Sequence, residues 1–110
     1  MLFIRAEDFF AQASEAPRLT REEEKQLARE MGQNPAARER LIKSYYPMVA
    51  SHIRRAPRDV QTLRTVYVCL ESPAEGVDQF DFLQDSETFT HHLSWRMRQC
   101  ITRCIVDRRP

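Results

Sequence analysis

Glycine is nearly missing from this sequence, and several catalytic motifs are missing with it. Two of the 110 residues are glycine, and none forms a Gly-rich phosphate-binding loop. There is no Ser/His/Asp or Cys/His set within a recognisable motif. Asp78, Asp81 and Asp85 lack the glycine and closing glutamate of a calcium loop. His52 falls on the apolar face of a predicted helix, where a partly buried core residue is expected. We therefore predict no catalytic residues and no enzyme.

Cysteine is also scarce, and its three positions show no paired spacing. Such a set does not make a disulfide framework. Cys100 and Cys104 lie four residues apart on a predicted helix, and we interpret them as small apolar core residues. A zinc site built from these two with His91 and His92 would lack the CxxC or HxxxH pairs typical of zinc proteins. We predict no metal and no other cofactor.

Long apolar runs are missing as well. No stretch is long enough to cross a bilayer, so no membrane partner is expected. The apolar part of the N-terminal MLFIRAEDFF is too short for a signal peptide, because acidic residues follow it at once. Together with the unpaired cysteines, this favours a reducing, cytoplasmic location.

Charge is abundant, at 30% of the residues, and unevenly distributed. Residues 71–87 carry six acidic side chains and no Lys or Arg. Residues 36–64 carry seven basic side chains and two acidic ones, and from residue 89 onward five arginines stand against one aspartate. The asymmetry favours an anionic partner at the basic segments. It is equally compatible with acidic and basic segments that face each other in the fold, so both interpretations stay open.

The composition is rich in Arg, Glu, Leu, Ala and Gln, which predicts an all-α fold. Residues 1–110 are enough for one domain with one core, and we expect a compact bundle of about five to six helices. Within this domain, residues 19–56 form the first long helices, residues 57–88 a further helix and an acidic loop, and residues 89–108 the last helix.

Capping residues place the first helix boundaries. A short helix over residues 6–16 ends at a proline. Thr20 and Glu23 form a capping box at the start of the second helix, and Gly32 suits its C-terminal end. Asn34 and Pro35 suit the N-cap and the first position of the third helix.

Prolines and capping residues divide the second half of the chain. Pro47 should kink or loosen the third helix. Asp59 can cap the next helix, although its run TVYV could also be a strand. Pro73 restarts a short acidic helix, and DFLQDSET is predicted as a loop. The last helix begins near Thr90 and continues to about Arg108.

The last helix separates into two faces on a helical wheel. Its apolar stripe contains Leu93, Met97, Ile101 and Cys104, with Cys100 and Ile105 beside them. Another face carries Trp95, Gln99 and Thr102, flanked by Arg96, Arg98 and Arg103. Arginine neutralises phosphate, tryptophan stacks on an unpaired base, and glutamine and threonine bond base edges. This face suits nucleic acid; the alternative is a surface helix whose tryptophan packs on a neighbouring element.

The last helix also resembles the promoter-reading helix of the sigma-70 family of bacterial RNA polymerase sigma factors. That family typically shows F-S-T-Y-A-x-W-W-I-R-Q-A-I-x-R-A-I-x-D, against FTHHLSWRMRQCITRCIVD here. Cys100 and Cys104 stand where the family usually has alanine. Upstream, LTREEEKQLAREMGQNPAARERLIKSYYPMVASHIRR and GVDQFD are similar to further stretches of the family in the same order. The likeness covers most of residues 19–107.

The resemblance implies a region-two domain that binds core RNA polymerase and captures the partly single-stranded minus-ten element of promoter DNA. Gln99 and Thr102 would contact the upstream base pair of that element. Arg98 and Arg103 would contact phosphate, and Trp95 would stand at the junction of duplex and single strand. An anti-sigma factor is a further candidate partner.

Two differences from the family favour an alternative function. Arg96 and His92 stand where the family has a second tryptophan and a tyrosine, and RTVYVCL (residues 64–70) stands where its polymerase-binding helix reads D-L-I-Q-E-G-N. The alternative is a sigma-like interaction module that regulates transcription without melting DNA, and it predicts that residues 64–70 are exposed. A plain helix-turn-helix regulator fits less well, because it needs a tight turn before the reading helix.

Overall fold

The computed structural model describes residues 3–83 and 88–108, and helices account for most of them. They are α1 Ala6–Glu15, α2 Arg21–Glu30, α3 Pro35–Lys43, α4 Tyr46–Arg54, the 3-10 turn η1 Arg58–Val60, α5 Leu63–Gln79 and α6 Phe89–Asp107. No strand occurs in the two described ranges, which confirms the all-α prediction and excludes a strand at TVYV. None of these helices is both long and apolar enough to cross a membrane.

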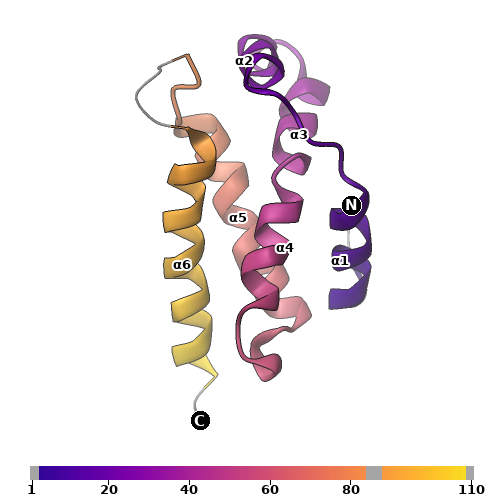
Figure 1. Cartoon of the computed structure of the whole chain (residues 1–110), viewed down its shortest axis with the longest axis vertical. Helices are drawn as coiled ribbons and strands as arrows, with labels where there is room; N and C mark the ends of the chain where they lie inside the picture. Colours follow the sequence, from indigo (N-terminus) through magenta and orange to yellow (C-terminus); the bar gives the residue numbers. More distant parts are fainter. Residues whose placement is uncertain (1–2, 84–87, 109–110) are drawn as a thin grey trace.

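The last two helices lie side by side along one edge of the bundle. In Figure 1, α6 runs alongside α5, α4 lies beside both of them, and α1 is on the opposite side of α4. α2 packs against α3 at one end of the molecule, which extends 44 Å along its longest axis. The outer side of α6 therefore faces away from the other helices.

The predicted caps of α2 and α3 are confirmed. The Thr20 hydroxyl accepts from the Glu23 backbone N–H at 3.1 Å, and the Glu23 carboxylate accepts from the Thr20 N–H at 3.0 Å. The Asn34 side chain accepts from the N–H of Ala36 at 3.1 Å, and Pro35 is the first residue of α3. Gly32 lies in the turn after α2, but its backbone is not left-handed, so its glycine-specific freedom is not used there.

Pro47 has a larger effect than the predicted kink, because the chain forms two helices instead of one bent helix. α3 ends at Lys43 and α4 begins at Tyr46. Pro47 lies in the first turn of α4, where its missing N–H leaves no helical hydrogen bond unmade. Tyr45, between the two helices, is 4% exposed and turns into the core.

The prediction that Asp59 caps α5 is wrong. Asp59 lies in η1, and its carboxylate accepts from the Arg108 guanidinium at 2.6 Å. Thr62 is the N-cap, with its hydroxyl 3.3 Å from the Thr65 N–H. The helix cannot begin earlier, because the buried Val60 holds η1 against the core and the Gln61 amide donates to carbonyls at the end of α4.

The prediction that Pro73 restarts a helix is also wrong, because α5 continues through it from Leu63 to Gln79. Proline removes one hydrogen bond from a helix interior and usually kinks or ends it. Here the ring is fully buried, and the buried residues of α5 keep a helical spacing on both sides of it, at Val66, Cys69, Pro73 and Val77. Burial along one continuous stripe compensates for the lost hydrogen bond.

Aromatic side chains fill the core where α6 begins. Phe89 is 1% exposed, and its ring centroid lies 4.6 Å from Tyr45, 5.1 Å from Phe82 and 5.3 Å from Phe80. These rings come from three separate parts of the chain, so the N-terminal end of α6 is anchored to the rest of the bundle.

The N-terminal segment is tied to α5 by one hydroxyl group. The Tyr67 oxygen accepts from the Phe3 N–H at 2.6 Å and donates to the Phe3 carbonyl at 3.0 Å. Phe9 of α1 is fully buried and packs on Tyr46 of α4, with 5.4 Å between ring centroids. α1 is therefore fixed by partners that follow it in the chain.

Gly76 permits the close approach of α5 and α6. A Cβ atom there would lie 3.0 Å from two ring carbons of Phe89 and 3.2 Å from a guanidinium nitrogen of Arg96. We expect Gly76→Ala to lower the free energy of unfolding by about 1 kcal/mol, because overpacking against the enclosed Phe89 costs about 1–3 kcal/mol and outweighs a gain of about 1 kcal/mol in helix propensity. Urea unfolding followed by circular dichroism would measure this change.

Gly32→Ala is the matched control for this prediction. Nothing lies within 4 Å of a Cβ at Gly32, and its backbone is ordinary, so the control should leave stability unchanged or raise it. If Gly76→Ala were as stable as the original chain, the close approach at Gly76 would not be needed.

Candidate nucleic-acid interface

Local sequence places α6 so that one side is buried and the other faces solvent. Thr88 is its N-cap, and the Thr88 hydroxyl accepts from the His91 N–H at 3.2 Å. The buried residues confirm the predicted apolar stripe, with Phe89 added to it: Phe89, Leu93, Met97 and Ile101, with Cys100, Cys104 and Ile105 half-buried beside them. The opposite side of the helix is free for a partner.

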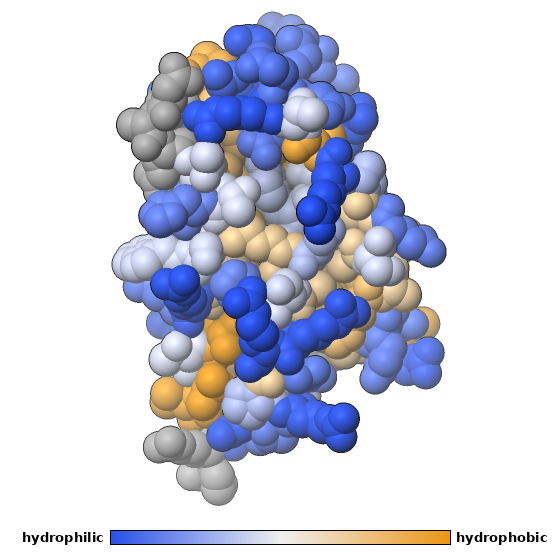
Figure 2. All heavy atoms as spheres, viewed as in Figure 1, coloured by the Kyte–Doolittle hydropathy of each residue, from blue (hydrophilic) through white to orange (hydrophobic). Residues whose placement is uncertain are grey.

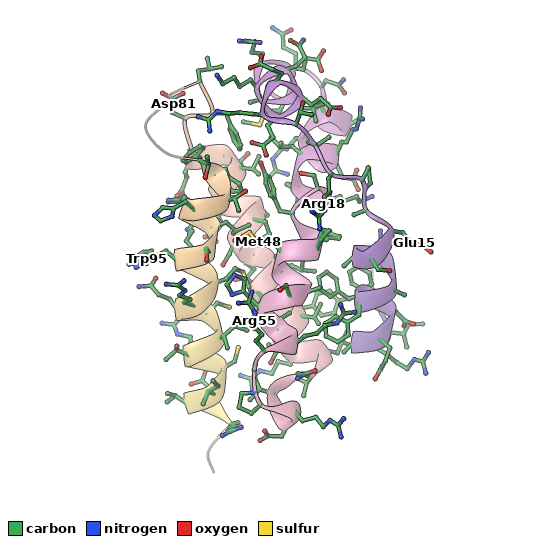
Figure 3. The ribbon with its side chains drawn as sticks, viewed as in Figure 1. Glu15, Arg18, Met48, Arg55, Asp81 and Trp95 are labelled. Atoms are coloured by element: carbon green, nitrogen blue, oxygen red, sulfur yellow. The ribbon has the colours of Figure 1, made fainter. Side chains whose placement is uncertain are left out.

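The three residues predicted to read DNA share this outer side. Trp95 is 59% exposed, and Gln99 and Thr102 follow on the next two turns, both exposed. Figure 3 shows Trp95 extending away from the bundle. Trp95 is therefore not packed into a neighbouring element of the described chain, as the alternative required. We call Trp95, Arg98, Gln99, Thr102 and Arg103 the reading face.

The three predicted arginines of α6 are not equivalent. Arg98 and Arg103 are exposed and form no ion pair with any residue in the described ranges. Arg96 instead turns toward α5, where one guanidinium nitrogen lies 3.5 Å from the Glu75 carboxylate. Another of its nitrogens is buried and has no hydrogen-bond partner among the described residues. Only 23% of the Arg96 side chain is exposed. The structure thus places five of the six predicted site residues on one exposed face, and Arg96 behind it.

Acidic and basic segments also face each other, as one of the two charge interpretations predicted. Asp78 of the acidic segment binds Arg38 of α3 at 2.7 Å, and this hydrogen-bonded guanidinium lowers the pKa of Asp78. Glu75 pairs with Arg96 as described. These contacts neutralise part of the acidic segment internally, while Arg98 and Arg103 keep their charge available for an anion.

A groove beside the reading face was not predicted from the sequence. It lies between α4 and α6 and is lined by His52, Arg55 and Pro57 on one side and by Arg98, Thr102 and Ile105 on the other. Burial lowers the pKa of His52, and the charges of Arg55 and Arg98 lower it further. Figure 3 shows Arg55 on the α4 side of this groove. The Arg54–Arg55 pair at the end of a predicted amphipathic helix was the available sequence signal.

The surface around the groove mixes polar and apolar groups. Figure 2 shows hydrophilic side chains over much of this face and an apolar patch over the last turns of α6, where Ile105 is half-buried and Val106 is 57% exposed. Arg55, across the groove from Arg98, extends the positive charge of the reading face toward α4. A bound strand would therefore meet cations on both sides of Thr102.

The apolar stretch at residues 64–70 is mostly inside the protein. Thr65, Val66 and Cys69 are buried, Tyr67, Val68 and Leu70 are half-buried, and Arg64 alone is exposed. The exposed apolar surface that would favour a pure protein-interaction module is therefore not found at this stretch.

The two histidines of α6 do not meet the cysteines. His91 is exposed, and His92 packs on Phe80 with 5.5 Å between ring centroids. Cys69 of α5 instead joins Cys100 and Cys104, and these three sulfur atoms lie within 4.8 Å of one another. The contact of Cys69 with Cys100 raises the pKa of Cys69 and lowers that of Cys100. This cluster is not predictable from local sequence patterns, because Cys69 is 31 residues from Cys100 and belongs to a different helix.

Comparison with known proteins gives no relative for this chain: no family model, no curated protein and no solved structure matches it. The residues of α6, their placement and the motif that they resemble are therefore the evidence for its function.

Proposed function

We propose that this chain is a sigma-like promoter-recognition domain of the bacterial cytoplasm. The reading face on α6 captures the minus-ten element of promoter DNA, and core RNA polymerase is its partner. The observation that carries the proposal is the exposed row of Trp95, Gln99 and Thr102, with Arg98 and Arg103 beside it, which pair with no acidic group in residues 3–83 and 88–108. These are the positions at which the sigma-70 motif has its DNA contacts.

Each group on the reading face supplies one part of strand recognition. Arg98 and Arg103 neutralise phosphates, which supplies affinity independent of sequence. The Gln99 amide can both donate to and accept from a base edge, as pairing with adenine requires. The Thr102 hydroxyl donates to the Arg98 carbonyl at 2.8 Å and keeps its lone pairs free to accept. Trp95 offers the exposed ring on which an unpaired base stacks.

The two positions at which α6 differs from the aromatic residues of the family motif, Arg96 and His92, make contacts within the bundle. Arg96 pairs with Glu75, and His92 packs on Phe80, so both positions serve contacts within the bundle. Neither side chain is free to hold an unstacked base. Trp95 is the one remaining aromatic platform of the motif, and strand capture should depend heavily on it.

The test is the binding of a fluorescent oligonucleotide with the nontemplate minus-ten sequence, with and without core RNA polymerase. We expect tighter binding of this strand than of a scrambled strand of the same composition. Gln99→Ala should reduce that preference, whereas Gln33→Ala, an exposed glutamine in the turn after α2, should not. Equal binding of both strands in the presence of polymerase would overturn the proposal.

Binding of the chain to immobilised core polymerase, measured together with its DNA preference, distinguishes promoter recognition from regulation of polymerase without DNA reading. Retention together with a sequence preference supports promoter recognition. Retention without any preference, unaffected by Gln99→Ala, would instead support a module that regulates polymerase without reading DNA.

A further inference from the structure

All three cysteines of the chain meet between α5 and α6. Cys69 comes from the middle of α5, and Cys100 and Cys104 come from successive turns of α6. The three sulfur atoms lie within 4.8 Å of one another, and those of Cys69 and Cys100 are 3.1 Å apart. Three thiols from two helices therefore form a group of potential ligands for a soft metal ion.

The spacing of the three sulfurs suits a shared ligand. Metal–sulfur bonds of about 2.3 Å place three ligands of one ion about 4 Å from one another. The cluster already lies near this arrangement, and the Cys69–Cys100 pair would open by less than about 1 Å to reach it. No histidine, aspartate or glutamate within the described ranges adds a fourth ligand atom to the group.

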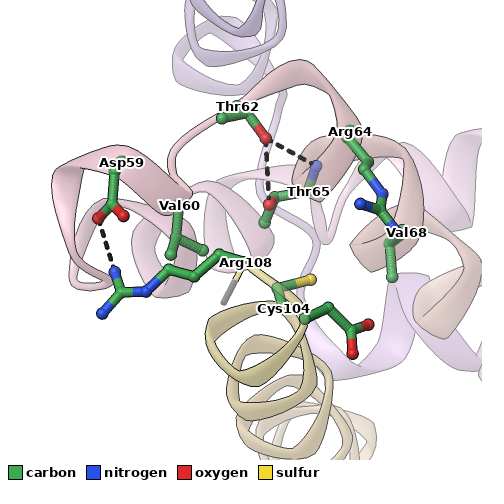
Figure 4. Close-up of a pocket in the computed structure, with 9 residues that line it drawn as sticks. Asp59, Val60, Thr62, Arg64, Thr65, Val68, Cys104 and Arg108 are labelled. Atoms are coloured by element: carbon green, nitrogen blue, oxygen red, sulfur yellow. Dashed lines mark hydrogen bonds and ion pairs between the residues drawn. The ribbon is translucent and has the colours of Figure 1, made fainter. Parts of the chain in front are cut away.

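The surroundings of the cluster are closed on one side and accessible on the others. Cys69 is fully buried, whereas Cys100 and Cys104 are half-buried. One groove, of about 370 Å³, reaches Cys104 between η1, α5 and the end of α6 (Figure 4). A second groove reaches Cys100 and is lined in part by Arg96 and Arg103. An ion thus has a path to the sulfurs, and only its Cys69 side would be fully shielded from water.

We propose that Cys69, Cys100 and Cys104 form a three-thiolate site for a soft cation of the Cu(I) type. Thiolates favour soft ions such as Cu(I), and a set of three sulfurs without a fourth protein ligand favours an ion that accepts three-coordination over four-coordinate zinc. Binding releases one proton from each thiol to solvent and leaves two net negative charges on the complex. The adjoining groove is lined by two arginines, Arg96 and Arg103, and by two glutamates, Glu71 and Glu75, so its side chains add no net charge beside the complex.

An ion at this position would tie α5 to α6 directly behind the reading face. Cys100 is the neighbour of Gln99, and Cys104 that of Arg103. The site would therefore hold the two helices together at the level of the predicted DNA contacts. This inference does not depend on the proposed function, since it is drawn from the cysteines alone.

The test is a titration of the full reduced chain with Cu(I), without oxygen and in competition with a chromophoric Cu(I) chelator. We expect one equivalent to be taken up and the melting temperature to rise with bound copper. Replacing Cys69, Cys100 or Cys104 singly by serine should weaken uptake by at least about tenfold. Ser72→Ala, in the same groove but without sulfur, should leave uptake unchanged.

X-ray absorption spectroscopy of the unsubstituted protein loaded with copper needs no variant. We expect it to show three sulfur atoms bound to the copper ion. No uptake, uptake insensitive to Cys69→Ser, or two sulfur neighbours would overturn the proposal. Tighter binding of Zn(II) than of Cu(I) would also overturn it.

Discussion

Trp95→Ala is expected to weaken binding of the minus-ten strand about 5- to 150-fold, because stacking on an aromatic ring contributes about 1–3 kcal/mol per base. The tyrosine and the second tryptophan of the motif are replaced by His92 and Arg96, which are engaged within the bundle, and the phenylalanine of the motif is the buried Phe89. No second ring on the reading face can therefore replace Trp95. The change would be measured as the dissociation constant of the labelled strand in the presence of core polymerase.

Two further variants make this expectation specific. Trp95→Phe keeps a flat aromatic ring and should recover most of the affinity. Ile4→Ala removes an apolar side chain that is 83% exposed at the opposite side of the molecule, and it should have no effect. Because Trp95 is 59% exposed, its removal should leave the melting temperature almost unchanged. A less than twofold loss of affinity with Trp95→Ala would show that the ring does not stack on a base.

Phe89→Ala is expected to lower the free energy of unfolding by about 3–5 kcal/mol. The ring is 1% exposed and enclosed by Tyr45, Phe80 and Phe82, so its removal leaves a cavity that rigid neighbours cannot fill. A domain of this size commonly has about 5–15 kcal/mol of stability in total. The variant should therefore unfold at a much lower urea concentration, with little change in the slope of the transition.

Leu83→Ala is the control for this cavity, because Leu83 is 54% exposed and its truncation should cost less than about 0.5 kcal/mol. Phe89→Leu retains part of the volume and should lose less stability than Phe89→Ala. A loss below about 1 kcal/mol for Phe89→Ala would mean that the aromatic cluster closes around the gap, and that the start of α6 is less firmly anchored than its burial indicates.

Sequence patterns predicted the features of this fold that are determined within a few residues. The capping box of Thr20 and Glu23 and the start of α3 at Asn34 and Pro35 each depend on contacts within one helical turn, and both are confirmed. The apolar stripe of α6 was likewise predictable, because a helix has one period and its buried residues repeat with it.

The errors concern residues whose role depends on distant partners. Asp59 was predicted as a cap from its local position, but its carboxylate binds Arg108, which is 49 residues away. Pro73 was predicted to break a helix, but burial of its ring within the α5 stripe outweighs the local preference.

Within the candidate site, the sequence predicted which side chains of α6 are exposed. It did not predict which side chains of α6 contact α5. The wheel placed Trp95, Gln99 and Thr102 on one side, but it could not show that Arg96 reaches Glu75 across the α5–α6 contact. It also could not show that Cys69 meets Cys100, because they are 31 residues apart and belong to different helices. Both relations arise only when α5 and α6 are packed together.

The hydrogen bonds between Phe3 and Tyr67 join parts of the chain that are 64 residues apart, which has a consequence for biosynthesis. A ribosome completes α1 well before it completes α5, so α1 emerges without the partners that later cover it. Phe9 likewise remains exposed until its packing partner Tyr46 has been synthesised. α1 is thus buried only after α4 and α5 have been made, and chaperones that bind exposed apolar segments would find it open until then.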